Sequence, residues 1–183
     1  MTLSILIPSL YNRAGMLDRL IKSITPHPEI EILTHIDDGK ISTGNKRNDL
    51  VKQAAGKYVV FVDDDDEITP EYIPEILAAS IHDNDCIVFK GWMTTDGADR
   101  KDFRLSINYP YAAVWENGKE VYLRFPNHIC PIKKDIAIQQ PFKNITIGED
   151  YLFALGLHEK GLLKTETVIN QFIYHYKYRT IKP

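Results

Sequence analysis

Short apolar runs alternate with stretches of helical spacing along the first part of the chain. The runs at 3–7, 30–36 and 57–62 predict strands, and the first and third are apolar enough to be buried on both faces. Residues 16–24 and 45–55 repeat apolar side chains on one helical face, each before a proline or a glycine. This order of strand, helix and strand predicts an α/β sheet that is parallel at its core, with right-handed crossovers and flanking helices.

The pattern becomes less regular after the third predicted strand. Thr69 and Pro70 have the residue types of an N-cap and a first helical position, which predicts a helix through about Ser80. Residues 86–90 predict a short strand, whereas the turn signals and broken apolar runs of 91–126 predict antiparallel strands and loops. Two elements complete the predicted order: a helix at 149–160 and a strand at 168–174.

Length and composition are those of one globular domain. The chain has 183 residues, of which 44% are hydrophobic and 26% charged, and domains commonly run to roughly 100–200 residues. A net charge of −3, from 22 basic and 25 acidic side chains, provides no global field that attracts nucleic acid or an anionic membrane. An anionic ligand must therefore be bound locally.

Cysteine usage and hydropathy indicate the compartment. Cys86 and Cys130 lack the number and spacing of a disulfide framework or a zinc site, so we expect two buried thiols in a reducing environment. The apolar N-terminal stretch is too short for a signal peptide or a membrane span of ~20 residues, and no other segment is longer. We expect a cytoplasmic protein without an integral membrane segment.

Four consecutive aspartates, 63–66, follow the third predicted strand. Neighbouring carboxylates repel one another by ~1 kcal/mol per close pair even in water, and a divalent cation would relieve that cost. Mg²⁺ and Mn²⁺ accept oxygen ligands from one or two carboxylates and from substrate phosphates. The alternative is a solvated acidic turn that precedes a helix N-terminus, where negative charge is favourable. Asp65 is the leading candidate for a direct metal ligand.

Three segments in order resemble the motifs of family 2 glycosyltransferases with the GT-A fold: SILIPSLYNR, IDDGKISTGNKRNDLVKQAAGKYVVFVDDDDEITPEYI and ITIGEDYLFALGL. The resemblance covers roughly the first 80 residues and resumes near residue 127. It implies one GT-A domain over 1–183, with a nucleotide-sugar-binding half at 1–90 and an acceptor-side half at 91–183. It also implies a metal-dependent, inverting transfer of a sugar, with Mn²⁺ or Mg²⁺, from a nucleotide-diphosphate donor such as a UDP-sugar.

The resemblance also assigns roles to residues of the first half. Asp38, with Asp37 beside it, is expected to reach the base, and Arg47, followed by Asn48, to lie near the nucleotide or ribose. Asp63 is expected on the ribose side and Asp65 at the metal. The residues expected to bind the nucleotide sugar are Pro8, Tyr11, Arg13, Asp37, Asp38, Arg47, Asp63 and Asp64.

The pair Glu149-Asp150 matches the motif from which inverting members of the family draw a catalytic base. A carboxylate within hydrogen-bond reach of an acceptor hydroxyl can take its proton during attack on the anomeric carbon. Asp150 is the predicted base and Glu149 the second candidate. The alternative is an acidic pair that only begins a helix and interacts with its dipole.

Two histidines are weaker candidates. His128 lies where the family often frames the acceptor side of the pocket, and a structural hydrogen bond is the alternative. The resemblance implies that His175 is a further metal ligand, with Lys177 or Arg179 available to neutralise diphosphate charge. A solvated, basic aromatic tail is the alternative for that segment.

Two other functions remain open at this point: a nucleotidyltransferase, and a non-catalytic module that binds a sugar or a protein. The first lacks support because no glycine-rich, lysine-containing phosphate loop lies near the first strand. For a transferase, a glycan acceptor is favoured by the resemblance, and a modified nucleobase in DNA is disfavoured by the net charge of −3. The aromatic segment 91–126 is the predicted acceptor region.

Overall fold

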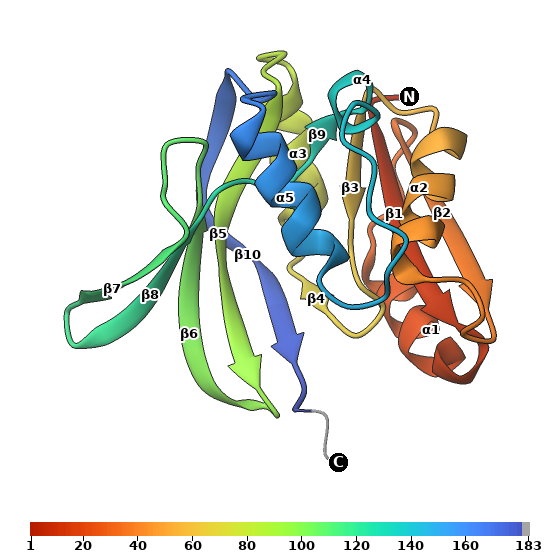
Figure 1. Ribbon diagram of the computed structural model, residues 1–183, viewed down its shortest axis with the longest axis horizontal. Coiled ribbons are helices and arrows are strands. Elements are labelled where there is room, and N and C mark those ends of the chain that lie inside the picture. The colour runs from red at the N-terminus through yellow and green to blue at the C-terminus, as the bar shows by residue number, and fades with distance from the viewer. Residues whose placement is uncertain (181–183) are drawn as a thin grey trace.

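The computed structural model describes residues 1–180. Its first half is built around β1 (Leu3–Leu10), which pairs in parallel with β2 (Ile30–Asp37) on one side and β3 (Tyr58–Phe61) on the other. All of β3, and all of β1 except its last residue, is buried, as the apolar runs predict. The crossovers run through α1 (Ala14–Ser23) and α2 (Thr43–Gln53). The predicted βαβ order is therefore confirmed (Figure 1).

The second half continues the same sheet with two antiparallel pairs. β5 (Cys86–Thr95) pairs with β6 (Ala98–Leu105), and β7 (Ala112–Glu116) pairs with β8 (Lys119–Arg124). The sequence predicts these antiparallel strands. It does not predict that β8 lies parallel to β6, because the chain returns through β7 at the edge of the sheet rather than through a helix. The β7–β8 ribbon extends away from the rest of the molecule (Figure 1).

Short pairings join the two halves. β9 (Ile132–Lys133) lies between β3 and β5, and β4 (Glu67–Ile68) pairs with β10 (Glu166–Tyr178). The ten-stranded sheet has the order β2-β1-β3-β9-β5-β6-β8-β7, and β10 lies beside β5 in parallel. Strands of two residues have no detectable period, so the sequence pattern does not reveal β4 or β9. The short helix α4 (Lys134–Ala137) follows β9 directly.

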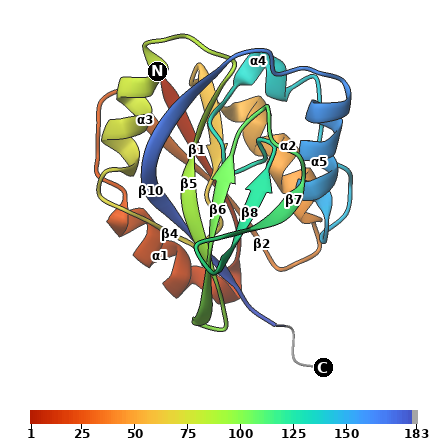
Figure 2. The ribbon, with the colours of Figure 1, turned by 90° about the vertical axis from the view of Figure 1, so that its left-hand side faces the viewer.

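Helices cover both faces of the sheet. α1 and α3 (Tyr72–Ser80) lie on one face, and α2 and α5 (Glu149–Glu159) lie on the other (Figure 2). The predicted start of α3 at Pro70 is wrong. The Tyr72 N–H donates to the Thr69 carbonyl at 3.0 Å, so Thr69 and Pro70 form a turn and the helix begins at Tyr72.

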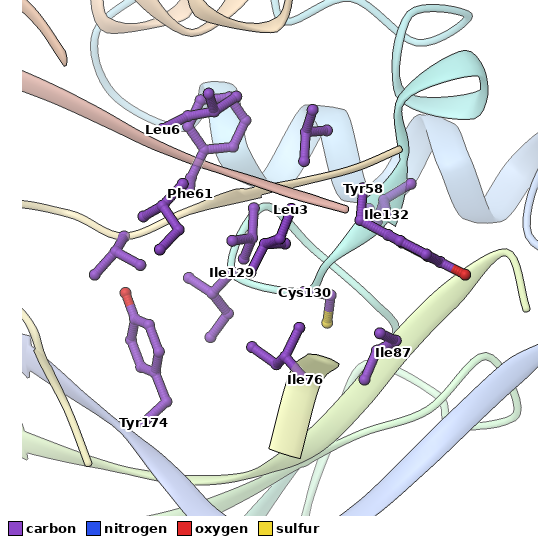
Figure 3. Close-up of a cluster of buried hydrophobic side chains, with 14 of the residues drawn as sticks. Leu3, Leu6, Tyr58, Phe61, Ile76, Ile87, Ile129, Cys130, Ile132 and Tyr174 are labelled. Carbon is purple, nitrogen blue, oxygen red and sulfur yellow. The ribbon is translucent and has the colours of Figure 1, made fainter. Parts of the chain in front are cut away.

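The hydrophobic core lies between the sheet and these helices (Figure 3). Tyr72, Phe89 and Tyr174 pack together, each pair with ring centroids 6.1 Å apart. Cys86 and Cys130 are buried free thiols, as the sequence predicts, and burial raises the pKa of Cys130 to about 12. Among residues 1–180, no helix is both long enough and apolar enough to cross a membrane.

Candidate functional site

The carboxyl ends of β1, β2 and β3 meet at one edge of the sheet, where ligands bind in open α/β folds. A cavity of about 570 Å³, here called the strand-end cleft, opens at this edge. Its walls come from the end of β1, from α2, from the aspartate run and from the segment 146–150 that enters α5. Segments that are far apart in the sequence thus share one cleft.

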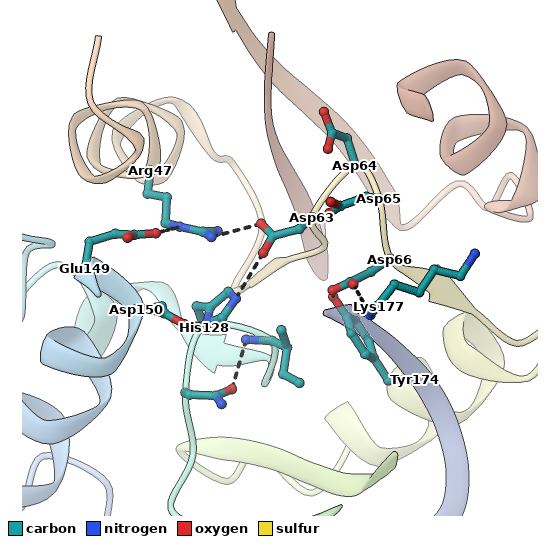
Figure 4. Close-up of polar contacts among 12 residues, drawn as sticks. Arg47, Asp63, Asp64, Asp65, Asp66, His128, Glu149, Asp150, Tyr174 and Lys177 are labelled. Carbon is teal, nitrogen blue, oxygen red and sulfur yellow. Dashed lines mark hydrogen bonds and ion pairs between the residues drawn. The ribbon is translucent and has the colours of Figure 1, made fainter. Parts of the chain in front are cut away.

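The four consecutive aspartates do not share one set of partners, and Figure 4 shows the contacts of Asp63 and Asp66. The run is held in a tight turn in which the Asp66 N–H donates to the Asp63 carbonyl at 3.0 Å. Asp63 accepts from Arg47 Nη2 at 2.9 Å. Asp64 accepts from the Ser9 hydroxyl at 2.5 Å and pairs with Arg13 at 2.8 Å. Protein cations and hydroxyls thus offset part of the repulsion expected from the sequence.

The accessible carboxylates of the run are those of Asp63, whose side chain is 25% exposed, and Asp65. The side chain of Asp65 is 23% exposed and lines the strand-end cleft, whereas the side chain of Asp64 is 1% exposed. Arg13 Nη2 also pairs with Asp65, so one guanidinium bridges both carboxylates. Two neighbouring aspartates with hard oxygen atoms fit Mg²⁺ or Mn²⁺, which takes its other ligands from water and phosphate. Among residues 1–180, no group of three or more His, Cys, Asp and Glu side chains is placed to hold a metal ion.

Asp66 faces the protein interior instead of the cleft. Tyr174 donates its hydroxyl to Asp66 Oδ2 at 2.7 Å, and the Lys177 N–H donates to Oδ1 at 2.8 Å. Burial, followed by the nearby charge of Asp63, raises the pKa of Asp66 well above its usual range. Asp66 therefore anchors β10 to the aspartate turn.

We expect Asp66→Asn to change the free energy of unfolding by no more than about 1 kcal/mol, and Asp66→Ala to lower it by about 1–3 kcal/mol. A raised pKa means that the fold binds the proton more tightly than the unfolded chain, so ionised Asp66 costs stability as the pH rises above about 3.9. Asparagine avoids that cost and retains an oxygen for the Lys177 N–H. Urea unfolding at pH 7 measures both variants, and equal losses would show that the negative charge itself is required.

Arg47 connects the aspartate run to the start of α5. Its side chain is 3% exposed, and its Nε donates to Glu149 Oε1 at 3.2 Å while its Nη2 donates to Asp63. The guanidinium also lies over the Phe61 ring, 4.9 Å from the centroid. Burial raises the pKa of Asp63, but Arg47 and then His128 lower it by more than burial raises it. The pKa of Asp63 therefore lies well below its usual value. Burial also raises the pKa of Glu149, against the opposing charge of Arg47.

Asp150 and Glu149 differ in accessibility. The Asp150 side chain is 41% exposed, whereas that of Glu149 is 6% exposed and bound to Arg47. His128 lies between Asp63 and Asp150. Its Nε2 is 3.5 Å from the Asp63 carboxylate, and its Nδ1 is 3.9 Å from the Asp150 carboxylate. Both ring nitrogens of His128 are buried, and neither has a hydrogen-bond partner within residues 1–180. Asp150 is therefore the carboxylate of the pair that a ligand can reach.

A buried lysine organises the ends of β1 and β2. Lys46 Nζ donates to the Ser9 carbonyl at 2.9 Å and to Asp37 Oδ1 at 2.8 Å. The hydrogen bond from Lys46, and then one from the Ile41 N–H, lower the pKa of Asp37 to about 2. Asp38 instead lies at the surface and pairs with Lys40 at 2.5 Å.

α2 also positions the loop that leads into α5. Asn48 exchanges two hydrogen bonds with the Phe142 backbone, each at 2.9 Å. Gly44 lies so close to this loop that a Cβ atom would be 1.8 Å from the Lys143 carbonyl oxygen. Gly148, with φ of 82°, then turns the chain into α5. These contacts fix Glu149 and Asp150 opposite the aspartate run.

His175 is engaged within the protein. Its Nδ1 lies 3.1 Å from Glu67 Oε2 and its Nε2 lies 2.9 Å from the Thr94 hydroxyl. The ring stacks on Trp92 with centroids 4.9 Å apart. A metal-ligand role for His175 would require one of these contacts to break, and that role stays a prediction.

The strand-end cleft brings together most of the residues that the sequence singles out. Tyr11, Asp37 and Asp38 do not line it; Tyr11 is 68% exposed at the surface. Sequence reasoning misses Ser9, Lys46 and Tyr176, which do line it, since nothing in the local pattern marks them. The predicted residues on its walls are Pro8, Arg13, Arg47, Asp63, Asp64, Asp65, Glu149 and Asp150.

A second, smaller cavity of about 190 Å³ adjoins this cleft and is called the ribbon cavity. Asp150 and Tyr176 line both cavities. The other walls of the ribbon cavity come from β5, β6, β8 and the segment 127–129, together with Tyr111, which precedes β7. Tyr122 lies on β8. The predicted acceptor region therefore supplies most of this second cavity.

Comparison with known proteins identifies the family. S. aureus TarS 1–349 in complex with UDP-GlcNAc has a TM-score of 0.72 at 18% identity, over 100% of this chain and 60% of that chain. The complex of TarS 1–349 with UDP has a TM-score of 0.70 at 18% identity, over 97% of this chain and 60% of that chain. The chain thus spans 60% of those TarS structures, and the likeness agrees with the predicted GT-A fold. No curated protein matches the chain. Residues 42–141 match the glycosyl transferase family 2 model, and because this match covers more than half of the chain, the protein belongs to glycosyl transferase family 2.

Proposed function

We propose that this chain transfers a sugar from a UDP-sugar, bound with a divalent ion in the strand-end cleft, to an acceptor hydroxyl, with inversion at the anomeric carbon. One observation carries the proposal: Asp63–Asp65 and Glu149–Asp150 line one cleft of about 570 Å³. That volume falls within the roughly 300–1,000 Å³ of small-ligand sites. The cleft thus has carboxylates that would bind a divalent ion together with the donor diphosphate, and a separate carboxylate that would accept a proton from the acceptor.

The donor side is supported by the charges around the aspartate run. Arg13 and Arg47 supply cations, and Asp65 would hold the divalent ion, with Asp64 as its neighbour. When bound, such an ion offsets negative charge on the diphosphate as it departs. The complexes of TarS with UDP-GlcNAc and UDP favour a uridine nucleotide as the donor group.

The acceptor side is supported by Asp150. The acceptor oxygen attacks the anomeric carbon and forms the new C–O bond, while Asp150 takes the hydroxyl proton. The bond between the anomeric carbon and the diphosphate oxygen breaks, and UDP leaves with the electron pair. A single displacement of this kind inverts the configuration at the anomeric carbon. Glu149 then serves as a positioning residue, because Arg47 holds it and little of its side chain is exposed.

Asp65→Ala tests the donor site. We expect the wild type to bind UDP in the presence of Mn²⁺ and the variant to lose at least about tenfold in affinity, because one of the few protein ligands of the ion is removed. Titration calorimetry with and without Mn²⁺ measures this. Asp18→Ala is the matched control, since Asp18 is an exposed carboxylate paired with Lys22 on α1. Absence of UDP binding by the wild type with Mn²⁺ or Mg²⁺ would contradict the proposal.

The products separate this reaction from that of a nucleotidyltransferase. Sugar transfer releases UDP, whereas nucleotidyl transfer releases pyrophosphate. We therefore expect UDP to be released from a panel of UDP-sugars in the presence of Mn²⁺, and no pyrophosphate to be released when UTP and sugar 1-phosphates are supplied instead. A protein that binds UDP-sugars and releases neither product would instead be a binding module.

A further inference from the structure

Among residues 1–180, one arginine and no lysine lines the ribbon cavity: Arg124, at the end of β8. Arg124 Nη1 donates to the carbonyl oxygens of Ala112 and Leu123, at 2.6 and 2.8 Å. These two bonds use both protons of Nη1 and fix the guanidinium to the ribbon. Within residues 1–180, Nε and Nη2 of Arg124 donate to no protein atom, and neither is among the buried unpartnered atoms. A fork of free N–H donors therefore remains for a ligand.

Three cations of the neighbouring strand β6 are instead neutralised by protein carboxylates. Arg100 pairs with Asp102, Lys101 with Glu120 and Arg104 with Glu116. Arg124 has no carboxylate within 4.0 Å in the part of the chain that the structure describes. The arginine that lines the cavity is thus left without a counter-charge among these residues.

Two tyrosine rings hold the guanidinium in place. Arg124 Cζ lies 3.9 Å from the Tyr111 ring centroid and 4.6 Å from that of Tyr122. Stacking on aromatic faces limits the guanidinium to one plane, and a planar fork matches the two oxygens of a carboxylate or phosphate. The geometry is that of an anion-recognition site rather than of a solvated surface arginine.

The position of this fork relates it to the reaction. Asp150 lines the same cavity of about 190 Å³, which is below the roughly 300–1,000 Å³ of common small-ligand sites. The cavity therefore has room for one small unit of an acceptor, with a hydroxyl at Asp150 and another group at Arg124.

We propose that the acceptor is anionic, and that the ribbon cavity binds a phosphate or carboxylate group of the acceptor unit at Arg124. This inference rests on the proposed sugar transfer. Tyr111 and Tyr122 hold the arginine, and Asp150 receives the proton from a hydroxyl of the same unit. Specificity arises because a neutral unit leaves the Arg124 fork without a partner.

The test compares acceptors that differ only in charge. Methyl β-glucoside, methyl β-glucuronide and methyl β-glucoside 6-phosphate are supplied with the UDP-sugar that the wild type hydrolyses fastest. We expect the KM for at least one anionic acceptor to be about 10- to 100-fold lower than that for the neutral glucoside. The comparison between glucuronide and 6-phosphate identifies which anion is bound.

Arg124→Gln should bring the ratio between the KM for the neutral glucoside and the KM for the anionic acceptor to about 1, chiefly by raising the KM for the anionic acceptor. Arg124→Lys should recover part of the difference, because it keeps the charge without the fork. Arg104→Gln is the control, since Arg104 belongs to the same sheet but pairs with Glu116. Hydrolysis of the UDP-sugar without acceptor, together with Tm, verifies that each variant is folded.

Equal KM values for charged and neutral acceptors with the wild type would overturn the inference, as would an unchanged difference in a folded Arg124→Gln variant. If the wild type hydrolyses no UDP-sugar, the proposed function fails separately. Binding of the glucuronide and the 6-phosphate, measured by saturation-transfer NMR, then tests the anion site alone. Binding by the wild type that is lost in Arg124→Gln supports the site, and equal or absent binding overturns it.

Discussion

Asp150→Asn is expected to lower kcat for sugar transfer by about 10²–10⁴-fold while UDP binding in the presence of Mn²⁺ stays unchanged. The side chain lines both cavities and is 41% exposed, so it can reach an acceptor hydroxyl. Asparagine has nearly the same shape but cannot accept the proton. Steady-state kinetics with a UDP-sugar and an acceptor, and calorimetric titration of UDP, measure the two quantities.

Glu149→Gln is the matched control for this prediction. Glutamine keeps an oxygen that can accept the hydrogen bond from Arg47 Nε, and Glu149 is largely buried. We expect its effect on kcat to be smaller than that of Asp150→Asn. A large loss with Glu149→Gln, together with an active Asp150→Asn variant, would assign the base to Glu149 instead.

Arg47→Met is expected to lower the free energy of unfolding by about 3–5 kcal/mol, because breaking a buried ion pair leaves an uncompensated charge. Arg47 is 3% exposed and donates to both Asp63 and Glu149. Methionine fills much of the volume but leaves both carboxylates without their cation. Urea unfolding at pH 7 measures the loss. Lys52→Met is the control on the same helix, because Lys52 is exposed and its pair with Asp49 is a surface pair, worth about 0–1 kcal/mol.

The pH dependence of stability gives an independent check on Arg47. The pKa of Asp63 in the fold is well below its unfolded value of about 3.9. The pair between Asp63 and Arg47 therefore stabilises the fold above that pH, and this stabilisation is lost as the pH falls. The raised pKa of Glu149 acts with the opposite sign and opposes this trend. We expect the difference in the free energy of unfolding between the wild type and Arg47→Met to decrease below about pH 4. A difference that is constant from pH 7 to pH 3 would mean that lost packing, not lost charge, is responsible.

The sequence by itself determines the first half of the fold. Apolar runs at β1 and β3 identify buried strands because a strand covered on both faces is largely apolar instead of alternating between apolar and polar residues. The helices between these strands follow from their apolar spacing, and the position of Asp63–Asp66 after β3 places that run at the ligand edge of a parallel sheet. These features are local, so they can be read along the chain.

Only the tertiary structure decides which partners and which degree of exposure each of the four aspartates has. The same residue type occurs at four successive positions, and the partners come from distant segments: Ser9 and Arg13 for Asp64, Tyr174 for Asp66. The parallel pairing of β6 with β8, and with it the place of Arg124 in the ribbon cavity, is likewise absent from any local pattern. Hydrophobic periodicity reports which face of an element is buried. Burial, counter-charge and hydrogen-bond partners of a polar side chain depend instead on which segments meet in space, and that is settled by strand register and packing.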